Sequence, residues 1–213
     1  MRIFLFASLL AISLFSCKGK KEDKKTEPEQ PAKDTVTVVI NTAARDSALF
    51  QLTDEALTAF DKKDYEALSL LVHPDLGLRF SPYSYIDSTA DKIVTAEWIK
   101  KQANKPKQQK IEWGAIDNTA EPIRMTMDKY IDAFVYDVDF IHPEMRKVNE
   151  IIGRGNTINN IAEMYPGCDF TESHFPGFDK KMEGMDWRSV RLVFKKKDGK
   201  YYLVGVIHDE WTT

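Results

Sequence analysis

Apolar residues divide the chain into three stretches. Residues 3–15 are an apolar run interrupted only by serines, whereas residues 18–34 contain a single hydrophobic residue, Ala32. From about Thr35 onward, apolar and polar positions follow the patterns of a packed domain. We therefore predict a leader over residues 1–16, a tether over 17–44 and one domain over 45–213, with an insertion at about 142–185.

The domain begins with two predicted amphipathic helices. Asp46 can cap the first, and apolar residues recur at helical spacing after it, at Leu49, Leu52, Ala56, Leu57 and Phe60. A charged break at residues 61–64 precedes a second helix, which Pro74 ends. The inward residues of this second helix are Tyr65, Leu68, Leu71 and Val72.

Shorter elements follow in the middle of the chain. Alternation over residues 76–80 predicts a strand, and residues 95–101 predict a short helix. Trp113 lies in a short strand candidate, and Thr126 can cap a further helix. Residues 138–140 alternate as in another strand.

The clearest predicted element is a hairpin near the C-terminus. Residues 187–195 and 201–211 flank Asp198-Gly199, and Asp-Gly between two such runs favours a two-residue turn. A turn of this kind pairs residues whose numbers add up to 397. The hairpin is therefore expected to close a mixed α+β domain with a mostly antiparallel sheet.

This register gives the hairpin an apolar face and a mixed face. The mixed face contains Trp187, Ser189, Arg191, His208 and Glu210. A His beside a carboxylate and an Arg can perform general acid–base chemistry, so these five residues are a candidate pocket lining. A solvated sheet surface is the alternative interpretation.

The leader has the features of an export signal. Arg2 precedes a thirteen-residue apolar stretch, which is about 20 Å long as a helix and too short for the roughly 30 Å hydrocarbon core. Leu14-Phe15-Ser16-Cys17 resembles the lipobox of bacterial lipoproteins. The resemblance implies cleavage before Cys17 and its modification by diacylglycerol and a further acyl chain such as palmitate; an ordinary signal peptide is the alternative.

Charge and cysteine content fit an exported, tethered protein. Residues 18–34 hold six Lys and five acidic residues, a composition that cannot bury enough surface to fold. Lys21-Glu22-Asp23 resembles the acidic signal that sends some lipoproteins to the surface of the bacterial outer membrane. A lipidated Cys17 leaves Cys168 unpaired, and we expect a partly buried, inert thiol there rather than a nucleophile.

The order of the elements resembles the nuclear transport factor 2-like fold, a curved sheet wrapped by helices into a cone. Residues 48–72, 77–80 and 187–211 carry this likeness. Two sequence segments, residues 73–83 and residues 205–211, also resemble an uncharacterised group of bacterial exported proteins. That resemblance implies no activity. The resemblance implies N-terminal helices packed on a mostly antiparallel sheet.

Several function classes lack support in the sequence. The net charge is −3, which disfavours nucleic acid as a partner. The four histidines are far apart and no metal-ligand spacing occurs, so we expect neither a metal nor a cofactor. Gly153-Arg154-Gly155 lacks the remaining residues of a phosphate loop.

Two functional hypotheses remain. The first is a lipid-anchored cell-envelope protein that binds a small molecule, a glycan or an envelope protein without catalysis. The second is a small hydrolase, isomerase or dehydratase that uses His208 with Glu210 or Asp209. For the first, six aromatic residues can stack on sugar rings or build the core: Tyr83, Tyr85, Trp113, Tyr130, Tyr136 and Trp211.

Overall fold

The computed structural model describes residues 42–103, 105 and 107–212, all within a unit that spans Ile40–Thr213. The predicted leader, Cys17 and the tether up to residue 41 lie outside the described residues. A six-stranded sheet has the order β2-β1-β8-β7-β6-β5, and its neighbours are antiparallel except for β1 and β8. The bounds are β1 Leu78–Ser81, β2 Lys92–Val94, β5 Met145–Val148, β6 Asp169–Phe175, β7 Arg188–Lys197 and β8 Lys200–Glu210. A separate hairpin joins β3 Ile111–Ala115 to β4 Pro122–Met125.

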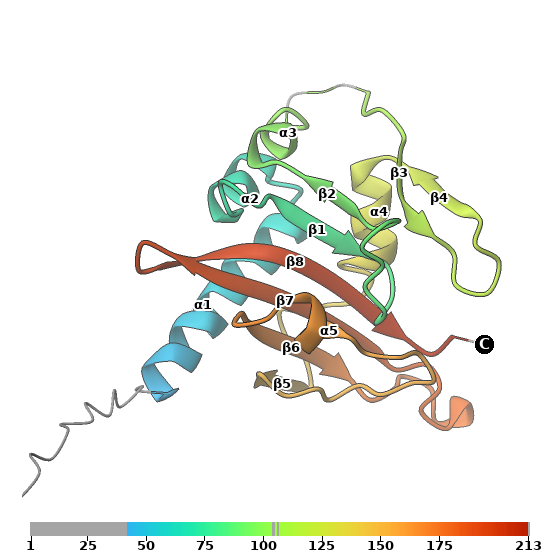
Figure 1. Cartoon of the computed structure of the whole chain (residues 1–213). Helices are drawn as coiled ribbons and strands as arrows, with labels where there is room; N and C mark the ends of the chain where they lie inside the picture. The colour runs from blue at the N-terminus through green and yellow to red at the C-terminus, as the bar shows by residue number, and fades with distance from the viewer. Residues whose placement is uncertain (1–41, 104, 106, 213) are drawn as a thin grey trace, which may run out of the picture. The chain divides into compact units, whose positions relative to one another are not determined.

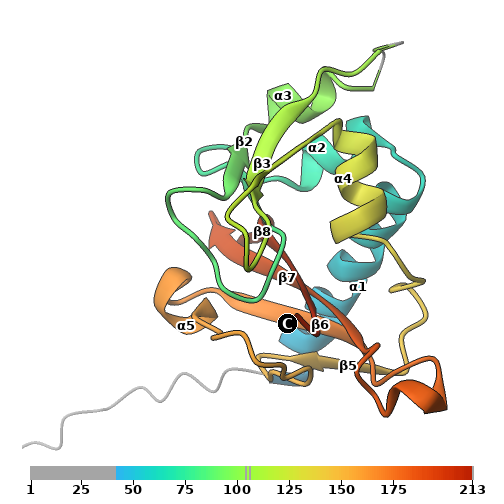
Figure 2. The ribbon, with the colours of Figure 1, turned by 90° about the vertical axis from the view of Figure 1, so that its right-hand side faces the viewer.

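Helices cover both faces of the sheet (Figures 1 and 2). The helices are α1 Thr42–Asp61, α2 Tyr65–Leu71, α3 Ala96–Lys100, α4 Met127–Phe134, α5 Ile161–Met164 and the 3₁₀ turn η1 Lys180–Met182. On one face, α1, α2 and α4 bury a large cluster against Val190, Leu192 and Val206. On the other face, Ile161 of α5 joins a smaller cluster with Val193 and Ile207. The predicted mixed α+β architecture with a mostly antiparallel sheet is confirmed, and we call the two sides the α1 face and the α5 face.

Local signals place most helix ends correctly. The side chain of Asp64 accepts a hydrogen bond from the Ala67 N–H at the start of α2, and Thr126 accepts one from Lys129 at the start of α4. The start of α1 was predicted wrongly, because the helix begins at Thr42 and Asp46 lies inside it. Residues 42–44 therefore belong to the helix and not to the tether.

The strand predicted over residues 138–140 is absent. The Phe140 N–H donates to the Val138 carbonyl over 2.8 Å, so the chain turns there. Arg146 on β5 donates to the Phe140 and Ile141 carbonyls. The turn buries the Phe140 ring against Phe175 on β6. The alternation of apolar residues therefore reflects this packing and not a strand paired in a sheet.

The segment 142–185, predicted as an insertion, supplies part of the sheet itself. It contains β5, α5, β6 and η1. Strand β6 pairs with β7 along its whole length, from Asp169 opposite Phe194 to Phe175 opposite Arg188. The segment therefore extends the sheet beyond the C-terminal hairpin and carries the small helix of the α5 face.

The C-terminal hairpin has the predicted turn but not the predicted register throughout. Partners add up to 397 from Lys197/Lys200 to Phe194/Leu203, and to 398 beyond that point. Val204 is the extra residue of a β-bulge, which changes the pairing of every later residue of β8. Val190 consequently lies opposite His208 and not opposite Ile207, so the prediction was wrong for the part of the hairpin that holds the candidate site.

The turn supports a first prediction. Asp198 and Gly199 have φ of +51° and +80°, the conformation that a two-residue turn requires and that a β-branched residue resists. We expect Gly199→Val to lower the free energy of unfolding by about 1–2 kcal/mol, measured by urea denaturation. Asp198→Asn is the matched control and should change it by less than about 0.5 kcal/mol, since Asn tolerates positive φ. Equal stability of both variants would contradict the assignment.

Candidate functional site

The five predicted pocket residues lie on two faces of the sheet. Ser189 and Arg191 of β7, and Trp187 just before it, lie on the α5 face, where Gly153 packs against both Trp187 and Ser189. His208 and Glu210 lie on the α1 face: the His208 ring contacts Phe134 edge-on, and Glu210 pairs with Arg188. The bulge at Val204 is the physical reason, because it moves His208 and Glu210 to the face opposite Arg191.

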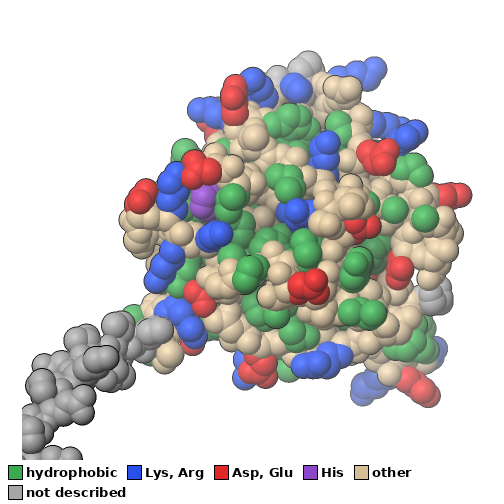
Figure 3. Space-filling view, in the orientation of Figure 1, with side chains coloured by type: hydrophobic (Ala, Val, Ile, Leu, Met, Phe, Trp, Pro, Cys, Tyr) green, Lys and Arg blue, Asp and Glu red, His purple; other side chains and the backbone are tan. Residues whose placement is uncertain are grey.

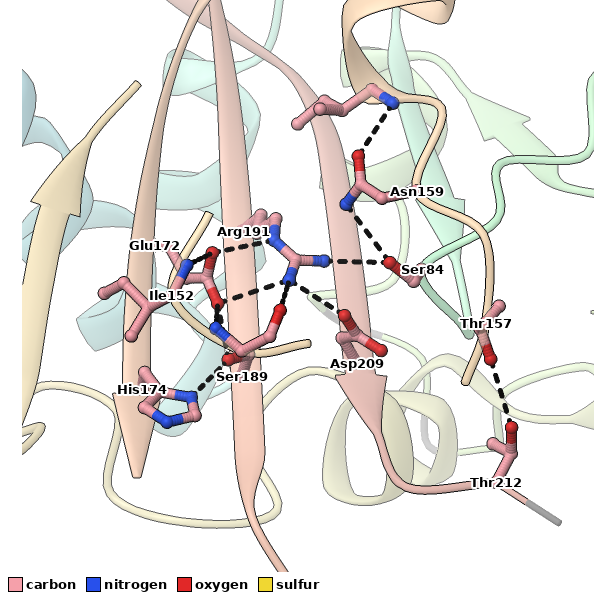
Figure 4. A network of polar contacts seen from close by, with 12 residues as sticks. Ser84, Ile152, Thr157, Asn159, Glu172, His174, Ser189, Arg191, Asp209 and Thr212 are labelled. Atoms are coloured by element: carbon pink, nitrogen blue, oxygen red, sulfur yellow. Dashed lines mark hydrogen bonds and ion pairs between the residues drawn. The ribbon is translucent and has the colours of Figure 1, made fainter. Parts of the chain in front are cut away.

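Arg191 is the centre of a buried polar cluster on the α5 face (Figure 4). The side chain is fully buried, and its Nε donates to Glu172 Oε2 over 2.9 Å. Nη2 lies 2.8 Å from Asp209 Oδ2 and donates to the Gly153 carbonyl over 3.0 Å. Nη1 donates to Ser84 Oγ over 3.2 Å. We call Arg191, Glu172, Asp209, Ser189 and Ser84 the Arg191 cluster.

Glu172 is the residue that sequence reasoning missed. It is fully buried on β6 directly opposite Arg191. Besides Arg191, its carboxylate accepts hydrogen bonds from the backbone N–H groups of Ile152 and Gly153 and from Ser189 Oγ, at 3.0, 2.8 and 2.6 Å. The buried ion pair is thus fully hydrogen-bonded, as buried charges need to be. Only assignment of β6 as a strand could have placed Glu172 beside Arg191.

A pocket of about 380 Å³ lies over this cluster, and we call it the Asp209 pocket. Its lining includes Ser84, Gly153, Arg154, Thr157 and Asp209. On one side of the pocket, the backbone at Gly153 packs directly on the indole ring of Trp187. A Cβ added at Gly153 would lie 2.6 Å from that ring. Burial raises the pKa of Asp209, and the nearby Arg191 only partly offsets this effect.

A second pocket of about 330 Å³ adjoins the first, since Thr157 lines both. We call it the Asp91 pocket; its lining includes Tyr83, Tyr85, Asp87, Asp91 and Asp117. Tyr85 is exposed and Tyr83 is half-buried. Together the two pockets present four carboxylates against one cation, Arg154, with several hydroxyl groups and one exposed aromatic ring. The excess of negative charge favours neutral or cationic polar ligands over anions.

The Asp91 carboxyl gives a prediction of pH dependence. Burial raises the pKa of Asp91 to about 6, against hydrogen bonds from the Ser81 hydroxyl and the Asp87 N–H. In the unfolded chain an Asp has a pKa of about 3.9. The folded state therefore binds more protons between about pH 4 and 6, and stability falls as the pH rises through this window.

We expect Asp91→Asn to remove this fall, which is on the order of 2–3 kcal/mol. The measurement is urea unfolding of both proteins at a series of pH values. The variant should gain on the wild type as the pH rises from about 4 to about 6. Asp46→Asn is a control, and parallel curves for Asp91→Asn and the wild type would show that Asp91 ionises normally.

His208 occupies a different environment from the one predicted. It is fully buried on the α1 face, and its Nε2 lies 3.4 Å from Asp137 Oδ1. Its Nδ1 has no hydrogen-bond partner among the described residues, so the ring is held through Nε2 and Asp137. Burial acts to raise the pKa of Asp137, but the His208 ring and Arg188 outweigh it and lower that pKa. Of the carboxylates named in the enzyme hypothesis, Asp209 faces the other side of the sheet. Glu210 shares the α1 face with His208 but pairs with Arg188, over 3.1 Å.

The remaining candidates from the sequence are the aromatic residues and Cys168. Trp113 and Tyr130 are fully buried and stacked on each other, whereas Tyr85 and Trp211 are exposed. Cys168 is half-buried, as predicted, and burial raises the pKa of its thiol. Within the described ranges, no three His, Cys, Asp or Glu side chains come together as a metal site requires. The same ranges contain no helix that is both long and apolar enough to span a bilayer.

Comparison with known proteins adds little to this description. No protein-family model and no curated protein matches the sequence. Among solved structures, the chain is similar to a Xanthomonas campestris protein described as a calcium/calmodulin-dependent protein kinase II association domain. The two are 12% identical, and the match covers 77% of this chain and 84% of the other, with a TM-score of 0.31. A similarity this weak carries no argument about fold or function.

Proposed function

We propose that the protein is a lipid-anchored cell-envelope protein whose domain binds a small polar ligand without transforming it. The observation that carries this proposal is the state of Arg191. All three of its guanidinium nitrogens contact protein groups, namely Glu172, Asp209, Ser84 and the Gly153 carbonyl. A guanidinium held by these partners is oriented by the protein itself, and it fixes the groups that line the Asp209 pocket.

The Asp209 pocket is suited to binding because Arg191 holds its lining groups in place. Ser84, Gly153 and Asp209 each line the Asp209 pocket and each contact Arg191. Their positions are therefore set before a ligand arrives, which lowers the entropy cost of association. The Arg191 cluster also retains one net negative charge, because two carboxylates share one guanidinium, and this charge disfavours an anionic ligand.

The ligand class follows from the lining of the two adjoining pockets. Asp87, Asp91, Asp117 and Asp209 can accept hydrogen bonds from hydroxyl or amino groups. The exposed ring of Tyr85 offers an apolar surface of the kind on which a sugar ring stacks. We propose a glycan or another polyhydroxylated ligand, either neutral or bearing an amine.

We also propose that the domain has a nuclear transport factor 2-like cone. Three features support this assignment: α1 and α2 come first in the chain, the long α1 packs on one sheet face, and the β7–β8 hairpin comes last. A crystal structure of residues 40–213 tests it. A flat sheet without a concave α1 face would contradict the assignment.

The ligand proposal is tested by thermal denaturation of the chain with three sugar classes: neutral hexoses, amino sugars and uronic acids. Neutral or amino sugars should raise the melting temperature and be recovered unchanged. A sugar at 100 times its dissociation constant adds about 2.7 kcal/mol of apparent stability. Asp209→Asn should reduce this effect and Asp46→Asn should not. No shift with either class, an equal shift with uronic acids, or chemical conversion of the sugar would overturn the proposal.

The anchor is a separate part of the proposal, and it rests on the leader and on Leu14-Phe15-Ser16-Cys17. Growth of a bacterial host with labelled palmitate should label the wild type and leave Cys17→Ala unlabelled. Cys168→Ala serves as the matched control and should still be labelled. Protease treatment of intact cells then tests the proposed outer-membrane surface location, since a surface-exposed chain is cleaved without lysis. Equal labelling of wild type and Cys17→Ala would refute the anchor.

A further inference from the structure

A cavity of about 210 Å³ on the α5 face has two cations and apolar walls. Arg79 of β1 and Lys195 of β7 line it together with Met164, Tyr165 and Ile93. It is separate from the Asp209 and Asp91 pockets, with which it shares no lining residue. Because binding sites for drug-sized molecules are about 300–1,000 Å³, this cavity suits a smaller ligand.

The sheet brings the polar groups of this cavity together. Arg79 is the register partner of Gly205 on the neighbouring strand β8. A Cβ at position 205 would lie 2.5 Å from the Tyr165 hydroxyl oxygen, so glycine leaves the space that the Tyr165 ring occupies. The Tyr165 hydroxyl is buried beside Arg79, from which its oxygen can accept a hydrogen bond, and its own O–H has no acceptor among the described residues. An unused donor thus lies in the same cavity as Arg79 and Lys195.

The two cations form no close ion pair with the described carboxylates. Neither Arg79 nor Lys195 forms a salt bridge with any carboxylate of the described part of the chain. Arg79 donates to the Asp87 backbone carbonyl over 3.4 Å and also to the Tyr165 hydroxyl, and its charge acts on the Asp87 and Asp91 carboxylates from beyond ion-pair distance. One oxygen of the Asp87 carboxylate, Oδ1, accepts hydrogen bonds from Thr89 and Ala90. The cavity therefore has a positive charge that an anionic group could neutralise.

The surroundings of the cations are apolar. Leu76 and Ile93 are 48% and 46% exposed at the mouth of the cavity. Figure 3 shows this face, with basic side chains among hydrophobic ones. Exposed apolar side chains around an unpaired charge favour a ligand that has both an apolar part and an opposite charge.

We propose that this cavity binds a small anionic amphiphile, with its carboxylate or phosphate between Arg79 and Lys195 and its alkyl chain against Met164 and Ile93. The Tyr165 hydroxyl donates to the same anionic group. Such a ligand can come from a free fatty acid or from a single-chain lipid phosphate, since the recognised chemistry is shared. The site is independent of the sugar ligand proposed for the Asp209 pocket.

Isothermal titration of the full chain with octanoate, octyl phosphate, octanol and acetate tests the proposal. At least one of the two amphiphilic anions should bind, and octanol and acetate should bind at least tenfold more weakly, since each lacks one half of the ligand. Tighter octanoate binding identifies a fatty-acid source, and tighter octyl phosphate binding a lipid phosphate. Binding of neither anion, or equal binding of octanol, would overturn the proposal.

Variants locate the binding within the structure. Lys195→Gln changes an exposed residue and should weaken binding of the preferred anion at least tenfold without loss of fold. Arg79→Gln should have an equal or larger effect, and Arg79→Lys should restore part of the affinity. Lys196→Gln is the matched control, because Lys196 lies over the Tyr201 ring instead. Affinity unchanged by both Lys195→Gln and Arg79→Gln would overturn the site, whereas Asp209→Asn tests only the sugar pocket.

Discussion

Replacement of Arg191 by Met is expected to lower the free energy of unfolding by about 3–5 kcal/mol. Met is similar in length and keeps most of the buried volume, so the loss comes from charge and not from a cavity. Glu172 and Asp209 would remain in the interior without their counter-ion, and both are almost completely buried. An unpaired buried charge costs far more than a surface ion pair contributes.

Urea denaturation at two pH values measures this effect and its cause. Loss of the guanidinium removes the charge that offsets the burial of Asp209, which raises the pKa of Asp209 further, so the variant binds more protons when folded. Its deficit should therefore be smaller at about pH 4.5 than at about pH 7.5. Arg124→Met is the matched control: Arg124 is 69% exposed and its pair with Glu112, which is 55% exposed, contributes little. A deficit below about 1 kcal/mol for Arg191→Met would mean that the cluster is not the rigid base of the pocket.

Replacement of Trp113 by Ala should be similarly costly, at about 3–5 kcal/mol. The indole is fully buried, stacks on Tyr130 with ring centroids 4.5 Å apart, and meets Phe80 and Trp98 edge-on. Its Nε1 also donates to the Met125 carbonyl on β4 over 2.9 Å. The substitution removes all of these contacts and leaves a cavity that the neighbouring rings cannot fill.

The matched control is Trp211→Ala, because Trp211 is 44% exposed. It should change the free energy of unfolding by less than about 0.5 kcal/mol. Urea denaturation of both variants, followed by circular dichroism, makes the comparison. If Trp113→Ala is as stable as Trp211→Ala, Trp113 is not a core residue and sugar stacking becomes its better interpretation.

Features that depend on neighbouring residues could be predicted from the sequence. Asp64 and Thr126 cap α2 and α4 because each side chain hydrogen-bonds an N–H group only three residues later. Asp198-Gly199 forms the hairpin turn because few residues other than glycine accept positive φ there. The α+β class and the two amphipathic helices at the start of the domain follow from hydrophobic periodicity in the same way.

The candidate site depended on contacts between residues distant in the sequence, and the sequence did not determine it. The bulge at Val204 satisfies packing on both faces of β8 at once: Leu203 joins the large cluster and Val204 the small one. No local sequence pattern indicates a bulge at Val204, yet the bulge places His208 and Arg191 on opposite faces of the sheet. Glu172 meets Arg191 only because β6 pairs with β7 across a separation of 19 residues. The sequence by itself determined the elements and their caps, and the tertiary structure decided which charged side chains share a face, because that depends on register and on packing from both sides.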